Sequence, residues 1–252
     1  ELATMGMRGA LSLSTLDIEV VIGEGDLDDA PGFRLGERIR GTAHGVGRDL
    51  PVIQMAVDPV DGTNAARKNA PGALCVAAGA LSGEGRLWGA PEGYADKRCV
   101  GPEIARAIRK LAEKGDVFRA GEWSLDPHQS LLEQPLEGLI AFAEKTLNKE
   151  VVVEFLDRPR NEEVAGAVER TGAVPRLVPA GDIASAVRTG SAAHNVDISA
   201  GIGGSPEGVI AAVIVKCYRG LFEQRPWFSP DADGARLRER HAGAGLDPDA
   251  IL

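Results

Sequence analysis

The chain has 252 residues and a formal net charge of −9, from 28 Lys and Arg against 37 Asp and Glu. Nucleic acids and anionic membrane surfaces both favour a basic protein surface, so this balance argues against either as the main partner. The longest apolar run, Val209–Val215, is far shorter than the roughly 20 residues of a membrane-spanning helix.

Short β-branched runs alternate with helical patterns along the chain, which predicts an α/β fold. The expected strands are, in chain order, Ile18–Ile22, Val52–Val57, Ala73–Leu81, Arg86–Ala90, Val151–Leu156, Val174–Val178 and Val196–Ala200. The expected helices are Glu1–Ser14, Pro102–Glu113, Leu136–Leu147, Glu162–Thr171, Asp182–Arg188 and Pro206–Cys217, followed by a solvated helix and loop in the tail.

The strand patterns differ between the two halves of the chain. The glycine-containing turn 82–85 lies between two of the early strands, which predicts a hairpin and a mixed sheet. From Val151 onward strands and helices alternate with short connections, which favours a mainly parallel sheet. Glycines and prolines interrupt the periodicity over residues 115–135, so we expect two units, 1–125 and 126–252.

The strongest local motif is the string Asp58-Pro59-Val60-Asp61-Gly62-Thr63, at the end of an expected strand. Pro59 is expected to stop the strand, and Gly62 to allow a tight turn that brings Asp61 back beside Asp58. Two carboxylates held this close favour a cation, and hard oxygen ligands favour Mg²⁺ or Mn²⁺, with two ions about 3.5–4 Å apart if more acids converge. Thr63 and the amides after it would hold a phosphate oxygen or an attacking water. The alternative is an ordinary Asp-rich turn that caps a helix.

Three further strings carry candidate site residues. Glu24 lies between two glycines after a hydrophobic strand, where a metal can approach it closely; the alternative is a solvated acidic loop. Gly201–Gly208 is expected to be a glycine loop that opens a helix and binds phosphate or sugar oxygens, with Glu207 within reach of a metal, although such a loop is weak evidence alone. Arg158 and Arg160 lie two apart in an expected extended segment, so both guanidinium groups would face one way and clamp a phosphate; the alternative is a pair of surface arginines.

Other kinds of chemistry find no support in the sequence. The four histidines show no partnering pattern, and there is no G-x-S-x-G string for a serine nucleophile. Cys75, Cys99 and Cys217 have no C-x-x-C spacing, so we expect them to be reduced in a cytoplasmic protein. Because the chain begins at Glu1 rather than Met, we expect the native protein to extend before it.

The four strings in this order resemble the class II fructose-1,6-bisphosphatases, the GlpX-type branch of the lithium-sensitive, metal-dependent sugar phosphatases. D-P-x-D-G-T is shared across that superfamily, whereas G-E-G-x-x-D-x-A-P, Arg158-Pro159-Arg160 and G-G-x-P-E-G are typical of this branch. The similarity runs from about Thr4 to Gly220. It implies the layered α-β-α-β-α sandwich of that superfamily.

The resemblance also implies roles for individual residues. The implied metal ligands, for two or more Mg²⁺ or Mn²⁺ ions, are Glu24, Asp58, Asp61 and Glu207. Asp61 and Thr63 are the implied catalytic residues, with Thr63 helping to activate the attacking water. The implied substrate-binding residues are Thr63, Tyr94, Arg158, Arg160, Asp182 and Gly204. The first unit would thus bind metal and the second would bind substrate, in a homo-oligomeric, cytoplasmic enzyme.

The sequence departs from the family pattern at several places. Ala180 replaces the first acid of an Asp-Gly-Asp string, and Asp61 stands where this branch usually has Glu. By the resemblance, a further metal-binding Asp would fall immediately before Glu1, and the family's C-terminal strands would follow Leu252. We therefore expect the chain to be either a piece of a longer protein or a shortened relative. The expected function is hydrolysis of fructose 1,6-bisphosphate at the 1-phosphate. The alternatives are the same chemistry on sedoheptulose 1,7-bisphosphate, an inositol phosphate or another sugar phosphate, or a non-catalytic sugar-phosphate-binding relative.

Overall fold

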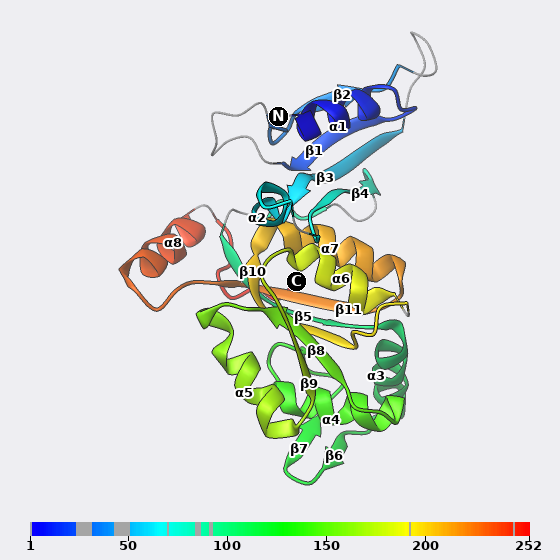
Figure 1. The fold of residues 1–252 in the computed structure, drawn as a ribbon, viewed down its shortest axis with the longest axis vertical. Helices are drawn as coiled ribbons and strands as arrows, with labels where there is room; N and C mark the ends of the chain where they lie inside the picture. Colours follow the sequence, from blue (N-terminus) through cyan, green and yellow to red (C-terminus); the bar gives the residue numbers. More distant parts are fainter. Residues whose placement is uncertain are drawn as a thin grey trace. The chain divides into compact units, whose positions relative to one another are not determined.

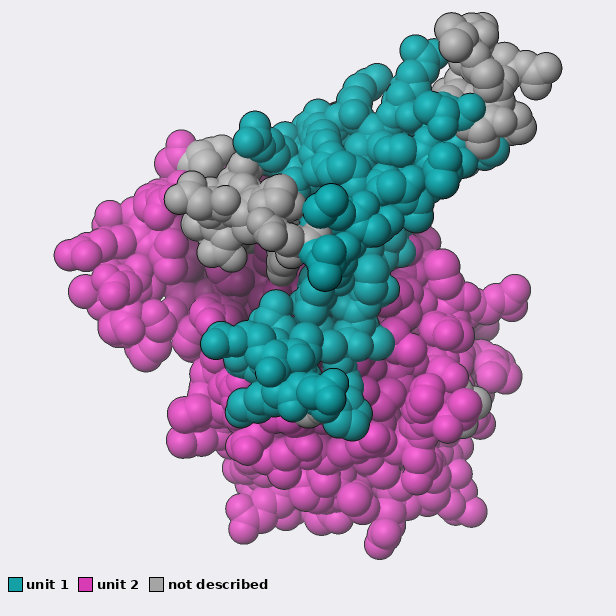
Figure 2. Space-filling view, turned by 45° about the horizontal axis from the view of Figure 1, so that its top comes forward, with its two compact units in different colours: residues 1–90 teal, residues 91–252 magenta. Residues whose placement is uncertain are grey.

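The computed structural model describes residues 2–23, 32–42, 51–69, 71–83, 87–90, 93–191, 193–243 and 245–252. Contacts divide the chain into two compact units, Glu1–Ala90 and Pro91–Leu252, which Figure 2 draws in different colours. This division falls well before the boundary expected at residue 125. The assignment of metal binding to the first unit and substrate binding to the second stays a prediction.

Unit 1 contains a mixed four-stranded sheet, as expected, in the order β2-β1-β3-β4 (Figure 1). β1 pairs parallel with β3, and β1–β2 and β3–β4 pair antiparallel. The elements of this unit are α1 (Leu2–Ser12), β1 (Asp17–Ile22), β2 (Arg38–Arg40), β3 (Val52–Asp61), α2 (Thr63–Arg67) and β4 (Leu74–Leu81).

The core of unit 1 lies on one face of this sheet. Met55 and Val57 of β3 are two residues apart and therefore share a face, where they pack with Ile18 and Val20 of β1 and with Phe33. The partly buried side chains of α1 pack against the same cluster. The helix thus covers the apolar face of the sheet.

The expected hairpin after β4 is wrong in its second strand. Residues 87–90 form no strand, Arg86 lies outside the described residues, and β4 pairs with β3 instead. The backbone N–H of Leu87 donates a hydrogen bond to Gln54 Oε1 at 3.1 Å. A side chain of β3 therefore takes up a backbone donor that a strand partner would have satisfied.

Unit 2 is built on a five-stranded sheet in the order β11-β5-β10-β8-β9. Its strands are β5 (Tyr94–Val100), β8 (Val152–Leu156), β9 (Val174–Val178), β10 (Ile198–Gly204) and β11 (Leu221–Trp227), and β6 (Phe118–Ala120) and β7 (Trp123–Leu125) form a separate pair. Its helices are α3 (Pro102–Lys114), α4 (Leu136–Leu147), the short 3₁₀ helix η1 (Pro159–Asn161), α5 (Glu162–Thr171), α6 (Asp182–Gly190), α7 (Ser205–Cys217) and α8 (Ala232–Gly243).

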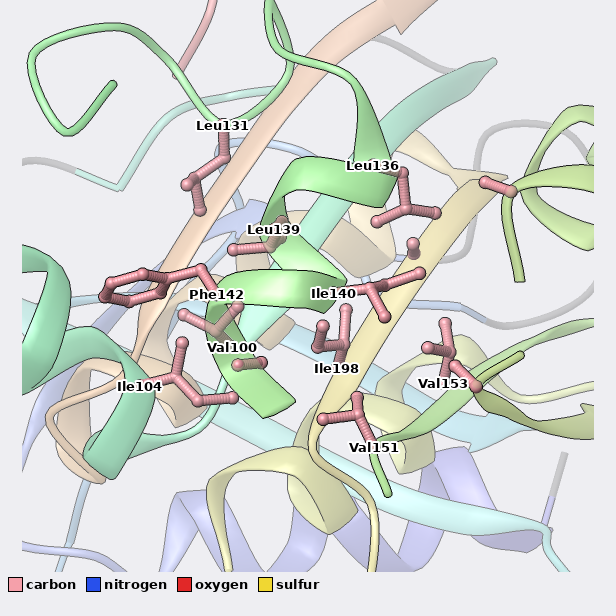
Figure 3. Close-up of a cluster of buried hydrophobic side chains, with 14 of the residues drawn as sticks. Val100, Ile104, Leu131, Leu136, Leu139, Ile140, Phe142, Val151, Val153 and Ile198 are labelled. Atoms are coloured by element: carbon pink, nitrogen blue, oxygen red, sulfur yellow. The ribbon is translucent and has the colours of Figure 1, made fainter. Parts of the chain in front are cut away.

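Two helical layers cover this sheet (Figure 1). Val100 of β5 belongs to a large cluster with residues of α3, α4 and α5, in which Leu139 and Ile140 of α4 lie over Ile198 of β10 (Figure 3). The next residue of β5, Cys99, points to the other face and packs with residues of α6 and α7. Unit 2 is thus an α-β-α sandwich, which confirms the α/β class.

The sheet of unit 2 is only half parallel. β8 pairs parallel with β9 and β10, as expected, but β5 and β11 add antiparallel pairings. β5 escaped the sequence analysis because it carries three consecutive charged residues, Asp96, Lys97 and Arg98. Charged residues break the apolar alternation that marks a strand. Lys97 is buried, Asp96 and Arg98 are partly buried, and each has a partner of opposite sign or a carbonyl acceptor.

No helix among the residues that the structure describes is long and apolar enough for a membrane span.

Candidate active site

Two of the expected metal ligands, Asp58 and Asp61, lie at the carboxyl end of β3 in unit 1. Their side chains are buried, with only 5% and 6% of the residue surfaces exposed. The expectation that Pro59 ends the strand is wrong, because β3 continues to Asp61. The register with β4 shifts there, so that Asp58 faces Val76 and Asp61 faces Leu74. This bulge places one extra residue on β3, which accommodates a proline that has no N–H for the ladder.

The turn after β3 has the expected geometry. Gly62 adopts a left-handed conformation with φ 79°, which costs a residue with a side chain strain energy. Its carbonyl accepts hydrogen bonds from the N–H groups of Ala65 and Ala66 at 2.8 and 3.1 Å. The turn therefore leads directly into α2, whose first residue, Thr63, is exposed.

The donor set of this turn fits a hard divalent cation. Buried carboxylate oxygens are the ligands that Mg²⁺ and Mn²⁺ prefer, and a cation compensates the cost of burying two acids three residues apart. Glu24 lies outside the described residues. Among the residues that are described, no group of three or more His, Cys, Asp and Glu side chains forms a metal site. The shared site of Glu24, Asp58, Asp61 and Glu207 stays a prediction.

In unit 2 the expected glycine loop is the end of a strand. Gly201 to Gly204 belong to β10 and pair in register with Lys97 to Tyr94 of β5. The N–H of Ser205, the first residue of α7, then bonds to the Gly93 carbonyl at 2.9 Å. The expectation of a loop is wrong because these glycines keep the sheet hydrogen bonds until the helix begins.

These glycines make room for carboxylates. A Cβ on Gly203 would overlap Oδ2 of Asp182, the first residue of α6, and a Cβ on Gly204 would overlap the carboxylate of Glu207 in the first turn of α7. Both acids lie in the first turns of helices, where the positive end of the helix dipole stabilises negative charge. The end of β10 thus brings together two acids from two helices.

A basic and aromatic group adjoins the same strand end. Arg160 lies over the ring of Tyr94, with its guanidinium carbon 4.4 Å from the ring centroid, and its Nε donates to the Ile202 carbonyl of β10 at 3.1 Å. Tyr94 is 46% exposed and packs edge-on against Trp227, the facing residue of β11. This stacking fixes the arginine while the phenol stays accessible to a ligand.

The two arginines do not share the expected extended segment. Arg158 is extended before Pro159, with φ −144° and ψ 144°, but residues 159–161 then form η1. Arg158 donates to the carbonyls of Asp157 and Pro179 at 2.7 and 2.6 Å, whereas Arg160 turns toward β10. The alternation argument for a clamp is therefore wrong, because it assumed a strand where the chain makes a helical turn.

The structure adds two residues that the sequence analysis gave no role. Asn161 is buried and accepts the Ile202 N–H at 2.7 Å, while its Nδ2 donates to the Leu156 carbonyl at 3.0 Å. It therefore connects the ends of β8 and β10. Lys97 is buried in β5, and its ammonium donates to Asp182 and to the Gly204 carbonyl. No signal in the sequence pointed to Lys97, because its charged neighbours Asp96 and Arg98 hide the strand pattern of β5.

Burial also raises the pKa of two side chains on β5, Cys99 and Asp96. Desolvation raises the pKa of the Cys99 thiol to about 12, so this residue is not a thiolate nucleophile near neutral pH. Burial raises the pKa of the Asp96 carboxyl as well, opposed by the nearby Arg98 and Arg225. Neither group carries the chemistry expected of the site.

Comparison with known proteins matches the whole chain, residues 1–252, to the family described as bacterial fructose-1,6-bisphosphatase, glpX-encoded. A D-fructose 1,6-bisphosphatase class 2/sedoheptulose 1,7-bisphosphatase of Crocosphaera subtropica is 32% identical over 237 residues, which cover 92% of this chain and 63% of the relative. The fructose-1,6-bisphosphatase 1 class 2 of Escherichia coli K12 is 30% identical over 241 residues, which cover 96% of this chain and 64% of the relative. The chain thus spans less than two thirds of the length of these relatives.

Proposed function

The chain belongs to the glpX-encoded bacterial fructose-1,6-bisphosphatase family, and we propose that it performs the metal-dependent hydrolysis of a sugar bisphosphate. The proposed reaction converts fructose 1,6-bisphosphate into fructose 6-phosphate and phosphate. Its chemistry is in-line attack of an activated water on the phosphorus.

One observation in particular supports this proposal. The end of β10 gathers Tyr94, Arg160, Asp182, Gly204 and Glu207, five residues to which the family resemblance assigns substrate or metal binding. They come from two strands, two helices and a 3₁₀ turn, spread over the chain from residue 94 to residue 207. Such convergence is expected of a binding site and not of scattered surface residues.

The residues suggest a division of labour in substrate binding. Arg160 supplies a fixed guanidinium for the phosphate that is not hydrolysed, and the exposed Tyr94 phenol supplies a hydrogen-bonding group beside it. Asp182 would accept hydroxyl groups of the sugar. Arg158 bonds to two carbonyls at the edge of this group and would add a second cation for the same phosphate.

The metal ligands of the proposed site are Glu24, Asp58, Asp61 and Glu207. When bound there, Mg²⁺ or Mn²⁺ would polarise the phosphoryl oxygens and make an attacking water more acidic. Asp61 and Thr63 lie on either side of Gly62; in the proposal Thr63 helps to orient this water and the Asp61 carboxylate takes up its proton.

The main alternative concerns the substrate. Ala180 stands where the family resemblance implies an acid, so the proposed sugar site has one hydrogen-bond acceptor fewer beside Asp182. Sedoheptulose 1,7-bisphosphate is the first rival substrate, because it appears in the name of relatives such as that of Crocosphaera subtropica. A non-catalytic sugar-phosphate-binding protein is the rival from another functional class.

Phosphate release by the purified chain tests the proposal. The substrates are fructose 1,6-bisphosphate, sedoheptulose 1,7-bisphosphate and an inositol monophosphate, each with Mg²⁺, with Mn²⁺ and with chelator. We expect metal-dependent release from a sugar bisphosphate, at least about 100-fold slower in Asp58→Asn. Asp17→Asn is the matched control, because Asp17 lies at the opposite end of the same sheet, and it should keep the activity.

Different results would separate the rivals. Turnover of sedoheptulose 1,7-bisphosphate alone would change the substrate and keep the chemistry. Calorimetric binding of fructose 1,6-bisphosphate without metal and without any turnover would favour the binding protein. Full activity of Asp58→Asn would remove Asp58 from the site.

A further inference from the structure

Lys97 is a buried cation in the middle of the unit 2 sheet. It lies on β5 between Gly201 of β10 and Gln224 of β11, and only 7% of its surface is exposed. The group borders a cavity of about 20 Å³, room for about one water molecule. An ammonium without bulk solvent is costly unless nearby acceptors compensate it.

The ammonium has two such acceptors, and they belong to two different helix starts. It forms an ion pair with Asp182, the first residue of α6, whose side chain is 18% exposed. It also donates to the carbonyl of Gly204, which precedes the first residue of α7. The helices α6 and α7 also pack against each other, and this one side chain connects the starts of both.

Both connected segments carry residues of the proposed site. The side chain of Lys97 fixes Oδ2 of Asp182, so the orientation of the other carboxylate oxygen follows from the ion pair. The ion pair occupies the space that a side chain on Gly203 would fill. A Cβ at this position would meet both Oδ2 of Asp182 and Nζ of Lys97. The pair is thus enclosed on the strand side.

The ion pair also sets the charge of the pocket. Asp182 with Lys97 is neutral as a pair, whereas Asp182 alone would present a negative charge to a bisphosphate. With Lys97 paired to it, the Asp182 carboxylate can accept hydrogen bonds from sugar hydroxyl groups without a net negative charge that would repel the phosphates.

We propose that Lys97 is a positioning residue that orients Asp182 and the Gly204 carbonyl for binding of a sugar bisphosphate. This inference rests on the proposed function. Lys97 contacts no substrate in it and acts through Asp182, so its effect belongs to substrate binding and not to the chemical step.

Steady-state kinetics with fructose 1,6-bisphosphate and sedoheptulose 1,7-bisphosphate test the inference. Lys97→Met keeps the length of the side chain without its charge. We expect its KM to rise by about tenfold or more while kcat falls by less than about threefold. Asp182→Asn should raise KM similarly, and the double variant should have a KM within about threefold of either single variant, because the two residues act as one unit.

Two further variants separate positioning from stability. Lys149→Met is the matched control, because Lys149 pairs with Asp197 at 2.8 Å at the start of β10, opposite the site, and it should leave both kinetic constants unchanged. If Lys97→Met does not fold by circular dichroism, Lys97→Gln carries the same prediction, since it keeps a hydrogen-bond donor at this position. A purely structural role would lower the melting temperature and leave KM unchanged in the folded variant.

The outcomes distinguish this inference from the function on which it rests. Wild-type protein that hydrolyses no sugar bisphosphate would overturn the proposed function, and the inference with it. Active wild-type protein together with a folded Lys97 variant whose KM stays within twofold would overturn the inference alone. An additive effect of the two substitutions in the double variant would also overturn it.

Discussion

Glu154 of β8 is a fully buried carboxylate whose removal should destabilise unit 2. It is 0% exposed and accepts hydrogen bonds from Ser185 and Arg188 of α6, with Arg188 Nη2 at 2.6 Å. Arg176 of β9 adds an ion pair at 3.1 Å. We consider Glu154→Gln, which keeps the size of the side chain and removes its charge.

The structure sets the size of the expected effect. Loss of one member of a buried ion pair costs about 3–5 kcal/mol, because the other charge stays buried. The side chain of Arg188 is only 20% exposed, so its charge would stay largely buried without its partner and would account for most of this cost. The side chain of Arg176 is 45% exposed and can be hydrated instead. The glutamine carbonyl still accepts one hydrogen bond, so we expect about 3 kcal/mol.

Urea unfolding followed by circular dichroism measures this loss. The midpoint should fall at unchanged m value, and the melting temperature should fall by about 6–12 °C. Glu163→Gln, an exposed residue in the first turn of α5, is the control and should change the stability by less than about 0.5 kcal/mol. A loss below 1 kcal/mol for Glu154→Gln would refute the argument from burial.

Three further changes test other features of the fold. Gly62→Ala places a side chain at φ 79° and should cost about 1–2 kcal/mol of unfolding free energy in urea, while an unchanged midpoint would contradict the strained turn. Gly138→Ala drives a Cβ into the Ser124 carbonyl and should cost about 1–3 kcal/mol by thermal unfolding, against no change if the helix simply shifts. Burial lowers the pKa of His241 below its ordinary 6.5, opposed by Asp247, so the unfolded chain takes up the proton first and stability falls as the pH drops below about 6.5. A plot of melting temperature against pH should therefore be flatter in His241→Leu over this range, and an equal slope in both proteins would contradict the assignment.

The sequence predicts the parallel half of unit 2 well. Leu136–Leu147, Glu162–Thr171 and Val174–Val178 have the bounds that periodicity alone indicates. The apolar residues of the two helices pack into one large core, so local pattern and tertiary packing agree there, whereas Val174–Val178 is an edge strand whose residues are mostly exposed. Such elements can be predicted from their own sequence, without knowledge of the segments that pack against them.

The antiparallel strands β5 and β11 could not be predicted in the same way. β5 has charges and β11 contains Pro226 with two charged residues, Glu223 and Arg225, so neither has strand-like composition. Their pairing depends on partners distant in the chain, such as the ion pair between Asp96 and Arg225 at 3.7 Å. Tertiary contacts override local preference in these strands.

The candidate site shows the same contrast. The turn at Gly62 could be predicted because a left-handed backbone conformation favours glycine, which the local sequence shows directly. The glycines before α7 are foreseen as important but for a different reason, since they accommodate the side chains of Asp182 and Glu207. Lys97 becomes visible only when β5 and β10 pair, because that pairing brings it to Asp182.

Titration calorimetry with Mn²⁺ tests the central claim most directly, namely that acids from separate segments hold the same divalent ions. Wild-type protein, Asp58→Asn and Glu207→Gln are compared, with Asp17→Asn as the control. We expect each of the two site variants to weaken Mn²⁺ binding by at least about tenfold, with the control unchanged. Binding of Mn²⁺ at wild-type affinity by either site variant would contradict the account.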